Sequence, residues 1–475
     1  MIPLRRTTLA AALAVALATG TAVFTPTAQA APDPDPGQSR TNAGATSDGG
    51  RYDRLIVHFA EGSAAATSDA AAAEEVRTVG NAAGHDLQLI RRLSTSGALV
   101  QVAAPLDKPA ADRLIAKFVE RSGVSYAEVD AVMTATLTPN DTFYPNQWHY
   151  YEPVAGMNLP AAWDTADGTG VTVAVLDTGI TAHPDLDANV VPGYDFVSSA
   201  ALARDGNGRD PVAADEGDWT TRNQCYKGSP ASNSSWHGTH VSGTIAAVTG
   251  NGIGVTGVAF GAKVQPVRVL ASCGGTLADI ADAITWASGG AVAGVPANPT
   301  PAKVINMSLG GSGTCGATYQ NAINGAVSRG TTVVVAAGNS NANASGFQPA
   351  SCTSTVVVAA SDREGNRASY SNYGTIVDVT APGGETATAA NGIASTLNSG
   401  TTTPAAPNYV YYQGTSMASP HVAGMAALVL SKKAHTPAEL EAVLKAGTRP
   451  LAGVCSGGCG SGLVDAAKTI ASLLP

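Results

Sequence analysis

The sequence has 475 residues, of which 44% are hydrophobic, and a formal net charge of −9 at pH 7. Such a chain is too long for one small domain and long enough for a large core with accessory segments. The negative charge and the lack of clustered Lys or Arg exclude the usual pattern of a nucleic-acid-binding protein.

The first 30 residues have the order of a secretory signal. Two arginines at positions 5 and 6 precede an apolar run over 9–24, and Ala28-Gln29-Ala30 follows. The run is short and is interrupted at 19–21, which argues against a membrane anchor. We therefore predict a signal peptide over 1–30, secretion of the protein and no membrane association.

Residues 31–50 are rich in Pro, Gly, Asp and Ser, which predicts a disordered spacer. A small α+β unit follows over 51–137. Its expected strands are 51–60, 86–93, 97–103 and 125–134, and its expected helices are 68–82 and 109–121. Its ordered part has roughly 80 residues, a size that is only marginally stable alone.

From residue 138 to 475, short β-branched runs alternate with Ala-rich helical segments. The expected strands are 171–176, 263–270, 303–309, 331–337 and 355–360, and the expected helices are 237–248, 276–289, 316–329 and 418–433. This alternation predicts an α/β fold with a mostly parallel sheet and helices on both faces. Sites in such sheets lie at the carboxyl ends of the strands.

Six cysteines in an exported chain favour disulfides, although six cysteines allow 15 pairings. We expect neighbours in sequence to pair: Cys225–Cys273, Cys315–Cys352 and Cys455–Cys459. Zinc is a weaker alternative, because no His or second Cys-x-x-Cys lies at ligand spacing near "CSGGC".

Three polar residues occupy strand ends or helix starts: Asp177 follows "VTVAVL", His237 opens "HGTHVSGTIAAV", and Ser416 lies in "GTSMASPHVAG". A serine nucleophile needs a histidine base and a carboxylate that orients the imidazole. Each residue has a structural alternative. Asp177 could cap a turn, His240 could be the base instead of His237, and the hydroxyls near Ser416 could be helix caps.

The stretch around Ser416 also predicts where a buried helix begins. Ser419 suits an N-cap, and Pro420 suits a first helical turn, where its missing N–H has no cost. The helix expected over 418–433 is apolar on all sides over 422–430, so we expect it to be buried.

Five segments together resemble the subtilisin-like serine peptidases: "VAVLDTGITAHPDL", "HGTHVSGTIAA", "INMSLGG", "VVVAAGN" and "GTSMASPHVAG". The resemblance spans about 141–475 and has the family's order of Asp, His and Ser. It implies that Asp177 orients the imidazole, His237 is the general base and Ser416 is the nucleophile. It also implies that Asn339 donates to the oxyanion and that His240 and His421 are not catalytic.

The same resemblance implies a substrate groove that pairs with an extended peptide. Ser308, Leu309 and Gly310 would form one side, and Gly274 and Gly275 would form the other. The residues around 336–338, including Ala337 and Gly338, carry no charge, which favours an uncharged side chain beside the scissile bond.

The unit over 51–137 fits the family's inhibitory prodomain, which is ferredoxin-like, and the peptidase domain is expected over 138–475. The prodomain would be an intramolecular inhibitor whose tail, about 126–138, lies in the substrate cleft until it is cut. We expect protein or peptide substrates and a monomer. The processing region is expected within 134–150, and a separate binding domain is the alternative.

Calcium is the expected structural ion, because the family shares one site between the "HPDL" aspartate and a carbonyl-rich loop. The corresponding residues are Asp185, Asn251, Ile253 and Val255. Oxygen ligands of mixed carboxylate and carbonyl type suit calcium. A second acidic loop is either an ion site or a solvated surface loop. Its carboxylates are Asp205, Asp210, Asp215, Glu216 and Asp218.

Two rival functions fit less well. "GIGVTG" (252–257) matches a dinucleotide-binding motif, but it follows a helix and precedes a strand, which is the reverse of the required order. An α/β-hydrolase esterase has the nucleophile elbow G-x-S-x-G, whereas residues 414–418 end in alanine, and its triad has a different order.

Overall fold

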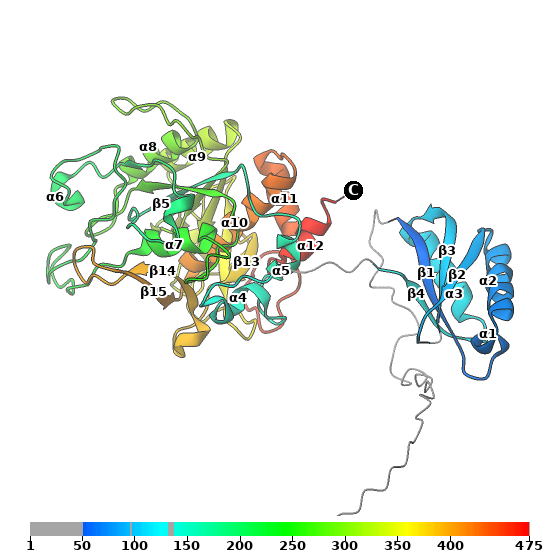
Figure 1. Ribbon diagram of the computed structural model, residues 1–475. Helices are drawn as coiled ribbons and strands as arrows, with labels where there is room; N and C mark the ends of the chain where they lie inside the picture. The colour runs from blue at the N-terminus through cyan, green and yellow to red at the C-terminus, as the bar shows by residue number, and fades with distance from the viewer. Residues whose placement is uncertain (1–50, 96, 132–136, 475) are drawn as a thin grey trace, which may run out of the picture. The chain divides into compact units, whose positions relative to one another are not determined.

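The computed structural model describes residues 51–95, 97–131 and 137–474 (Figure 1). The predicted signal peptide and spacer, 1–30 and 31–50, lie outside the described residues. The chain divides near residue 132 into two compact units. The boundary that we place between 137 and 138 stays a prediction.

The smaller unit is an antiparallel sheet in the order β2-β3-β1-β4. Its elements are β1 (Tyr52–Phe59), α1 (Ala64–Thr67), α2 (Asp69–Ala83), β2 (Leu87–Arg92), β3 (Gly97–Leu106), α3 (Lys108–Val119) and β4 (Val124–Val129). Ser68 and Asp107 cap α2 and α3 by accepting backbone N–H bonds. The two helices and the sheet share one apolar core that includes Leu55, Val76 and Phe118.

The larger unit contains a seven-stranded parallel sheet in the order β13-β12-β10-β8-β5-β7-β6. The strands are β5 (Thr172–Asp177), β6 (Tyr194–Asp195), β7 (Lys263–Arg268), β8 (Val304–Met307), β10 (Thr332–Ala336), β12 (Val356–Ser361) and β13 (Val379–Pro382). The predicted α/β fold with a parallel sheet is confirmed.

The central strands are buried on both faces. In β5, Val173 and Val175 belong to one hydrophobic core, and Ala174 and Leu176 belong to the other. Alternation of this kind is the reason that such strands are apolar throughout. The first core contains α5 (Leu159–Trp163), α7 (His237–Ala246), α10 (Thr415–Lys432), α11 (Pro437–Ala446) and α12 (Ala466–Ala471). The second contains α8 (Leu277–Ala287) and α9 (Ala317–Ser328).

Several short elements were not predicted. They include the helices α1, α5, α11 and α12 and the outer sheet strands β6 and β13. They also include α4 (Trp148–Tyr151), α6 (Ala200–Ala203) and two antiparallel pairs, β9 (Gly311–Ser312) with β11 (Phe347–Gln348) and β14 (Ile393–Asn398) with β15 (Pro407–Tyr412). Strand β14 is completely buried although its sequence, "IASTLN", is half polar. Its Ser395 and Thr396 donate to backbone carbonyls of α7, so these hydroxyls are satisfied only by a distant helix.

The predicted start of the buried helix α10 is wrong. The helix begins at Thr415 and not near 418, so Ser419 is not its cap and Pro420 lies inside it. The Ser419 hydroxyl has a tertiary partner instead of a capping role: Ser419 Oγ donates to Asn306 Oδ1 of β8 at 2.7 Å. The prediction that this helix is buried is correct.

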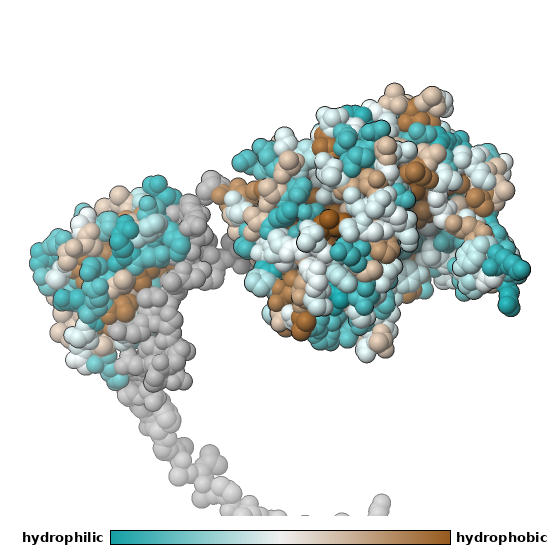
Figure 2. All heavy atoms as spheres, turned by 180° about the vertical axis from the view of Figure 1, so that it is seen from behind, coloured by the Kyte–Doolittle hydropathy of each residue, from teal (hydrophilic) through white to brown (hydrophobic). Residues whose placement is uncertain are grey.

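The structure joins Cys225 to Cys273, Cys315 to Cys352, and Cys455 to Cys459, the pairs expected from their neighbouring positions in sequence. Among the described residues, no helix is both long and apolar enough to span a bilayer. On the face of the larger unit seen in Figure 2, apolar residues form scattered small patches between hydrophilic ones.

The contact between α7 and β14 leaves no space for a side chain at Gly243. A Cβ atom there would lie 2.1 Å from Thr396 Oγ1 and 2.6 Å from Ser395 Oγ. We expect Gly243→Ala to lower the free energy of unfolding by about 1–3 kcal/mol. The measurement is the Tm, which should be lower than that of the unchanged protein.

Gly325→Ala in α9 is the matched control. Its Cβ would meet only the guanidinium at the end of the Arg329 side chain, at 3.3 Å. Because alanine favours helix more than glycine does, this variant should be neutral or more stable by up to about 1 kcal/mol. Equal losses in both variants would contradict the packing argument.

Candidate active site

The carboxyl ends of three adjacent strands lie level with one another. Val175 of β5 pairs with Asn306 of β8, and Asn306 pairs with Val334 of β10. Two residues further along each strand are Asp177, Ser308 and Ala336. The parallel register therefore brings the end of "VLD", the start of "SLGG" and the approach to "AAGN" to one edge of the sheet.

Asp177 and His237 form a direct pair at this edge. His237 Nδ1 donates to Asp177 Oδ1 at 2.7 Å, and the Thr178 N–H donates to the same oxygen at 2.8 Å. The Asp177 side chain is fully buried, and the His237 side chain is 21% exposed. A buried carboxylate that accepts from Nδ1 fixes the imidazole tautomer, so Nε2 is the nitrogen able to accept a proton.

Electrostatics favours the protonated form of His237. Burial is the largest single influence and lowers its pKa, but Asp177, Asp218 and Asp215 outweigh burial and raise the pKa above its ordinary value of 6.5. The two aspartates of the acidic loop therefore act on this histidine, a role that the sequence did not indicate.

His240 is in a different environment. It is fully buried, it stacks on Tyr412, and its Nε2 contacts the carbonyls of Ile393 and Val410. Burial lowers its pKa to about 3. His421 is also fully buried, and burial lowers its pKa to about 4. Both imidazoles are therefore neutral groups of the core.

Ser416 lies in the first turn of α10, after Gly414 with φ +151°. Such a backbone conformation favours glycine, which explains the "GTS" sequence. Ser416 is only partly buried, whereas Thr415 and Met417 beside it are buried. The partly exposed hydroxyl therefore stands at the positive end of a buried helix.

Pro420 has a specific consequence for this turn. It has no N–H to donate to the carbonyl of Ser416, four residues earlier, and Ser308 Oγ donates to that carbonyl instead at 2.8 Å. In return, Ser416 Oγ donates to the Ser308 carbonyl at 3.2 Å. The two serines thus tie the start of α10 to the end of β8.

Asn339 follows β10 and is oriented by Thr415. Both the backbone N–H and the hydroxyl of Thr415 donate to Asn339 Oδ1 at 2.8 Å. The amide nitrogen is therefore the atom that remains to donate, and Asn339 lines the same cavity as Ser416. The sequence did not identify Thr415 as the residue that sets this orientation.

A cavity of about 730 Å³ runs beside Ser416. It is lined by all seven residues expected to bind substrate: Gly274, Gly275, Ser308, Leu309, Gly310, Ala337 and Gly338. None of the described residues that line it is charged. A neighbouring cavity of about 430 Å³ shares Ser308 and Gly274 with it and is lined by His237 and Asp218.

The carboxylates of the acidic loop have separate partners. Asp205 forms an ion pair with Arg268, Asp210 accepts the Val212 N–H, and Asp215 and Asp218 accept hydroxyls near His237. Throughout the described part of the chain, no group of three or more His, Cys, Asp or Glu side chains is arranged to hold a metal ion.

Asp185 is a buried carboxylate that contacts the loop after α7. It is fully buried, it accepts from Asn251 Nδ2 at 2.7 Å and from the Val255 N–H at 2.8 Å, and burial raises its pKa to about 6. Asp141 adds to this rise and is itself 2% exposed, with both oxygens accepting the Gly250 N–H.

Two buried carboxylates beside one loop are costly unless a cation or further donors compensate them. The residues present therefore fit a calcium ion. The sequence did not select Asp141, which lies more than 40 positions before Asp185 in the chain. Only the folded loop brings its carboxylate to the same site.

The fold and this edge of the sheet define a serine peptidase of the subtilisin type. A family profile described as the subtilase family, Peptidase_S8, matches residues 168–462. The chain belongs to the subtilase family.

Named relatives agree with this assignment. The chain is 56% identical over 430 residues to an extracellular protease of Xanthomonas campestris, covering 88% of this chain and 73% of that protein. It is 43% identical over 403 residues to an extracellular basic protease of Dichelobacter nodosus, covering 82% of this chain and 65% of that protein. The chain is 57% identical to a protease of Pseudoalteromonas arctica whose structure is solved. That match has a TM-score of 0.70 and covers 71% of this chain and 100% of the other.

Proposed function

We propose that this subtilase is a secreted endopeptidase that hydrolyses peptide bonds through Asp177, His237 and Ser416 and is made as a self-inhibited zymogen. The observation that carries the proposal is the 2.7 Å pair of His237 Nδ1 with buried Asp177 at the sheet edge where Ser308 contacts Ser416.

In the first step His237 Nε2 takes the proton of Ser416 Oγ as that oxygen attacks the peptide carbonyl. The hydroxyl, which donates to the Ser308 carbonyl in the free protein, turns toward the imidazole. Asp177 stabilises the imidazolium that forms. The imidazolium then protonates the leaving amine, and a water molecule hydrolyses the acyl-enzyme by the same sequence.

The tetrahedral oxygen would be met by Asn339 Nδ2 and by the Ser416 N–H at the start of α10. Thr415 supports this role because it occupies Asn339 Oδ1 with two hydrogen bonds. An extended substrate would lie between 274–275 and 308–310 and bond to their backbones. The uncharged lining of the cavity favours an uncharged side chain beside the scissile bond.

The unit over 51–137 is proposed to be the prodomain. Its size and its antiparallel sheet packed against α2 and α3 suit a compact inhibitor whose tail enters the substrate groove. A folding-assistant role is also reasonable, because a parallel sheet built from distant strands forms slowly. We propose that the mature peptidase acts as a monomer on protein substrates.

Calcium is proposed to bind at Asp185 with Asn251, Ile253 and Val255, and Asp141 would add a second carboxylate. The ion would neutralise the buried charges and so stabilise the loop that follows α7.

The proposed nucleophile can be tested in the full-length chain. Ser416→Ala should lower peptide hydrolysis by roughly 10⁶, the size of the loss in subtilisin itself, and leave the protein unprocessed or bound by its own prodomain. A fluorophosphonate should label the wild-type protein at Ser416, as read by peptide mass spectrometry. Ser431→Ala, at the other end of α10, is the control and should keep full activity. Full activity of the Ser416 variant would disprove the proposal.

Asn339 can be tested separately. Asn339→Ala should reduce kcat on the order of 10²–10³ with little change in KM, a magnitude taken from the corresponding change in subtilisin. The reason is that the amide donates to the oxygen mainly in the transition state. An unchanged kcat, measured with a peptide substrate, would remove Asn339 from the proposed oxyanion site.

Chelation tests the ion. EDTA should lower the Tm of the inhibited wild-type protein, and Asp185→Asn should remove most of that difference. The control is Asp210→Asn in the acidic loop, which should keep it. If only the Asp210 variant lost the EDTA effect, the ion would bind at the acidic loop and not at Asp185. If EDTA left the Tm of the wild-type protein unchanged, the result would argue against structural calcium.

A further inference from the structure

The turn that carries His237 is held in an unfavourable backbone conformation. Trp236, the residue before it, has φ +50°. A non-glycine residue in this region costs roughly 1 kcal/mol or more, so its surroundings must hold it there. The Trp236 indole is 1% exposed, and its Nε1 donates to the Gly400 carbonyl at 2.6 Å.

Helix α7 also lacks an ordinary N-terminal cap. It begins at His237, and the side chain of Trp236, the residue at the N-cap position, makes no capping hydrogen bond. The first backbone N–H groups of a helix have no intrahelical partner, so others must accept from them. Here the Ser235 hydroxyl accepts from the His237 N–H at 3.3 Å, and the Thr178 hydroxyl accepts from the Gly238 N–H at 2.9 Å.

Each of these hydroxyls is aimed by a carboxylate of the acidic loop. Ser235 Oγ donates to Asp218 Oδ2 at 2.8 Å, and the Ser235 N–H donates to Asp218 Oδ1 at 2.6 Å. Thr178 Oγ1 donates to Asp215 Oδ2 at 2.5 Å. Because each hydroxyl gives its proton to an aspartate, its lone pair is turned toward the helix N–H.

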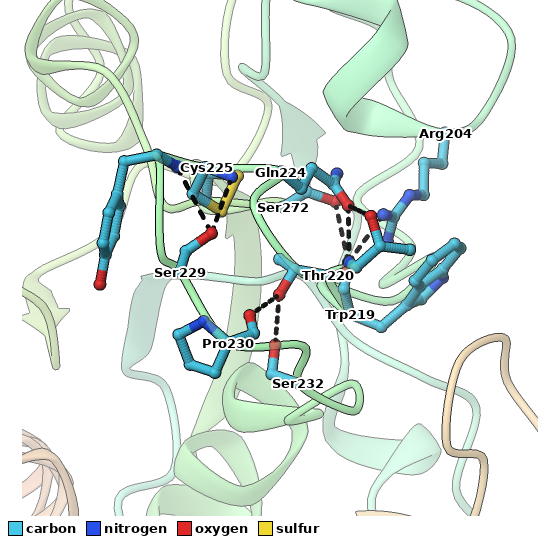
Figure 3. Close-up of a disulfide and its surroundings, with 12 residues drawn as sticks. Arg204, Trp219, Thr220, Gln224, Cys225, Ser229, Pro230, Ser232 and Ser272 are labelled. Atoms are coloured by element: carbon cyan, nitrogen blue, oxygen red, sulfur yellow. Dashed lines mark hydrogen bonds between the residues drawn. A yellow bond between two sulfur atoms is a disulfide. The ribbon is translucent and has the colours of Figure 1, made fainter.

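The loop that bears the two aspartates is itself fixed from outside. Arg204 donates to the carbonyls of Gly217 and Trp219 at 2.8 and 2.7 Å, and its guanidinium lies 3.9 Å from the centre of a Trp219 ring. Figure 3 shows Arg204 against Trp219 beside the Cys225–Cys273 disulfide. The Gly217 N–H also donates to Asp215 Oδ1 at 2.9 Å.

We infer that Asp218 and Asp215 are positioning residues for the general base. They act through Ser235 and Thr178 to hold the first turn of α7, and Asp218 places negative charge near the imidazole of His237. Burial raises the pKa of Asp215 to about 7, so this carboxyl adds its charge only above that pH. The inference rests on the proposed role of His237. It also gives the acidic loop a function that needs no bound ion.

The other charged or titratable groups near His237 are few and can be named. Asp177 pairs with it directly from the end of β5, and His240 follows one turn later in α7. Around the loop aspartates, Arg204 and Tyr412 interact with Asp218, and Arg268 interacts with Asp215; the Tyr412 hydroxyl also donates to the Ser235 carbonyl at 2.9 Å. Asp177 and His240 are unchanged in the variants below. The effect of each loop aspartate on His237 is therefore measurable by itself.

The test separates charge from geometry at one position. Asp218→Asn removes the charge and keeps one of the two acceptors, so the Ser235 N–H can still donate to the amide oxygen, while the Ser235 hydroxyl has to accept from the amide nitrogen instead of donating to it. Without the charge, His237 should lose its proton at lower pH. The acid limb of the kcat/KM profile should move down by roughly half a pH unit, with the plateau rate within about threefold of wild type. Asp218→Ala should show the same move and about a tenfold lower plateau, because the turn is no longer held.

Glu216→Gln is the matched control, since Glu216 lies between the two aspartates and is partly exposed. It removes the same charge from the same loop and should leave both the limb and the plateau unchanged. All rates are scaled to the fraction of enzyme that a fluorophosphonate titrates, and the pH dependence of that labelling rate provides a second profile.

Overlapping profiles for wild type and both Asp218 variants would overturn the inference. The inference would also be overturned if the acid limb of the kcat/KM profile moved as far in Glu216→Gln as in Asp218→Asn. If Asp218→Ala does not fold, Asp218→Asn decides the question against the Glu216→Gln control, because only the Asp218 variant should lower the acid limb. Failure of the proposed function itself would look different, because the wild-type protein would then not be labelled at Ser416.

Discussion

The parallel pairing of β5, β8 and β10 is the constraint on which the site depends. Parallel strands in register end at the same edge. Asp177 is therefore the last residue of one strand, and Ser308 and Asn339 come after two others that stop beside it, although the three are far apart in sequence. The sheet is buried on both faces, which makes its register costly to change. The geometry at the edge is therefore as rigid as the core that supports it.

Polar contacts connect the buried helix α10 to that sheet. Ser419 donates to Asn306, Asn306 donates to Ser308, and Ser308 donates to the carbonyl of Ser416. Buried polar groups are costly unless they are paired, so this chain of contacts fits only one placement of the helix on the strand. Pro420 belongs to the same arrangement, because it leaves the Ser416 carbonyl for Ser308 to satisfy.

His237 is held by a different device. Its imidazole is oriented by one buried carboxylate, Asp177, while its backbone lies in a turn that two further carboxylates support through hydroxyls. Asp177 first, and then the two loop aspartates, outweigh burial and raise its pKa. A raised pKa makes the imidazole a stronger base. The strained turn fixes the position of that imidazole.

The sequence by itself determined the alternation of strands and helices and the motifs that contain Asp177, His237 and Ser416. These features depend on local periodicity and on short segments. Only the tertiary structure decided where α10 begins, that β14 is buried, that Asp141 lies beside Asp185, and that Asp215 and Asp218 face the turn of His237. Each of these depends on a partner far along the chain, and local residue preferences carry no information about which distant group will satisfy a polar atom.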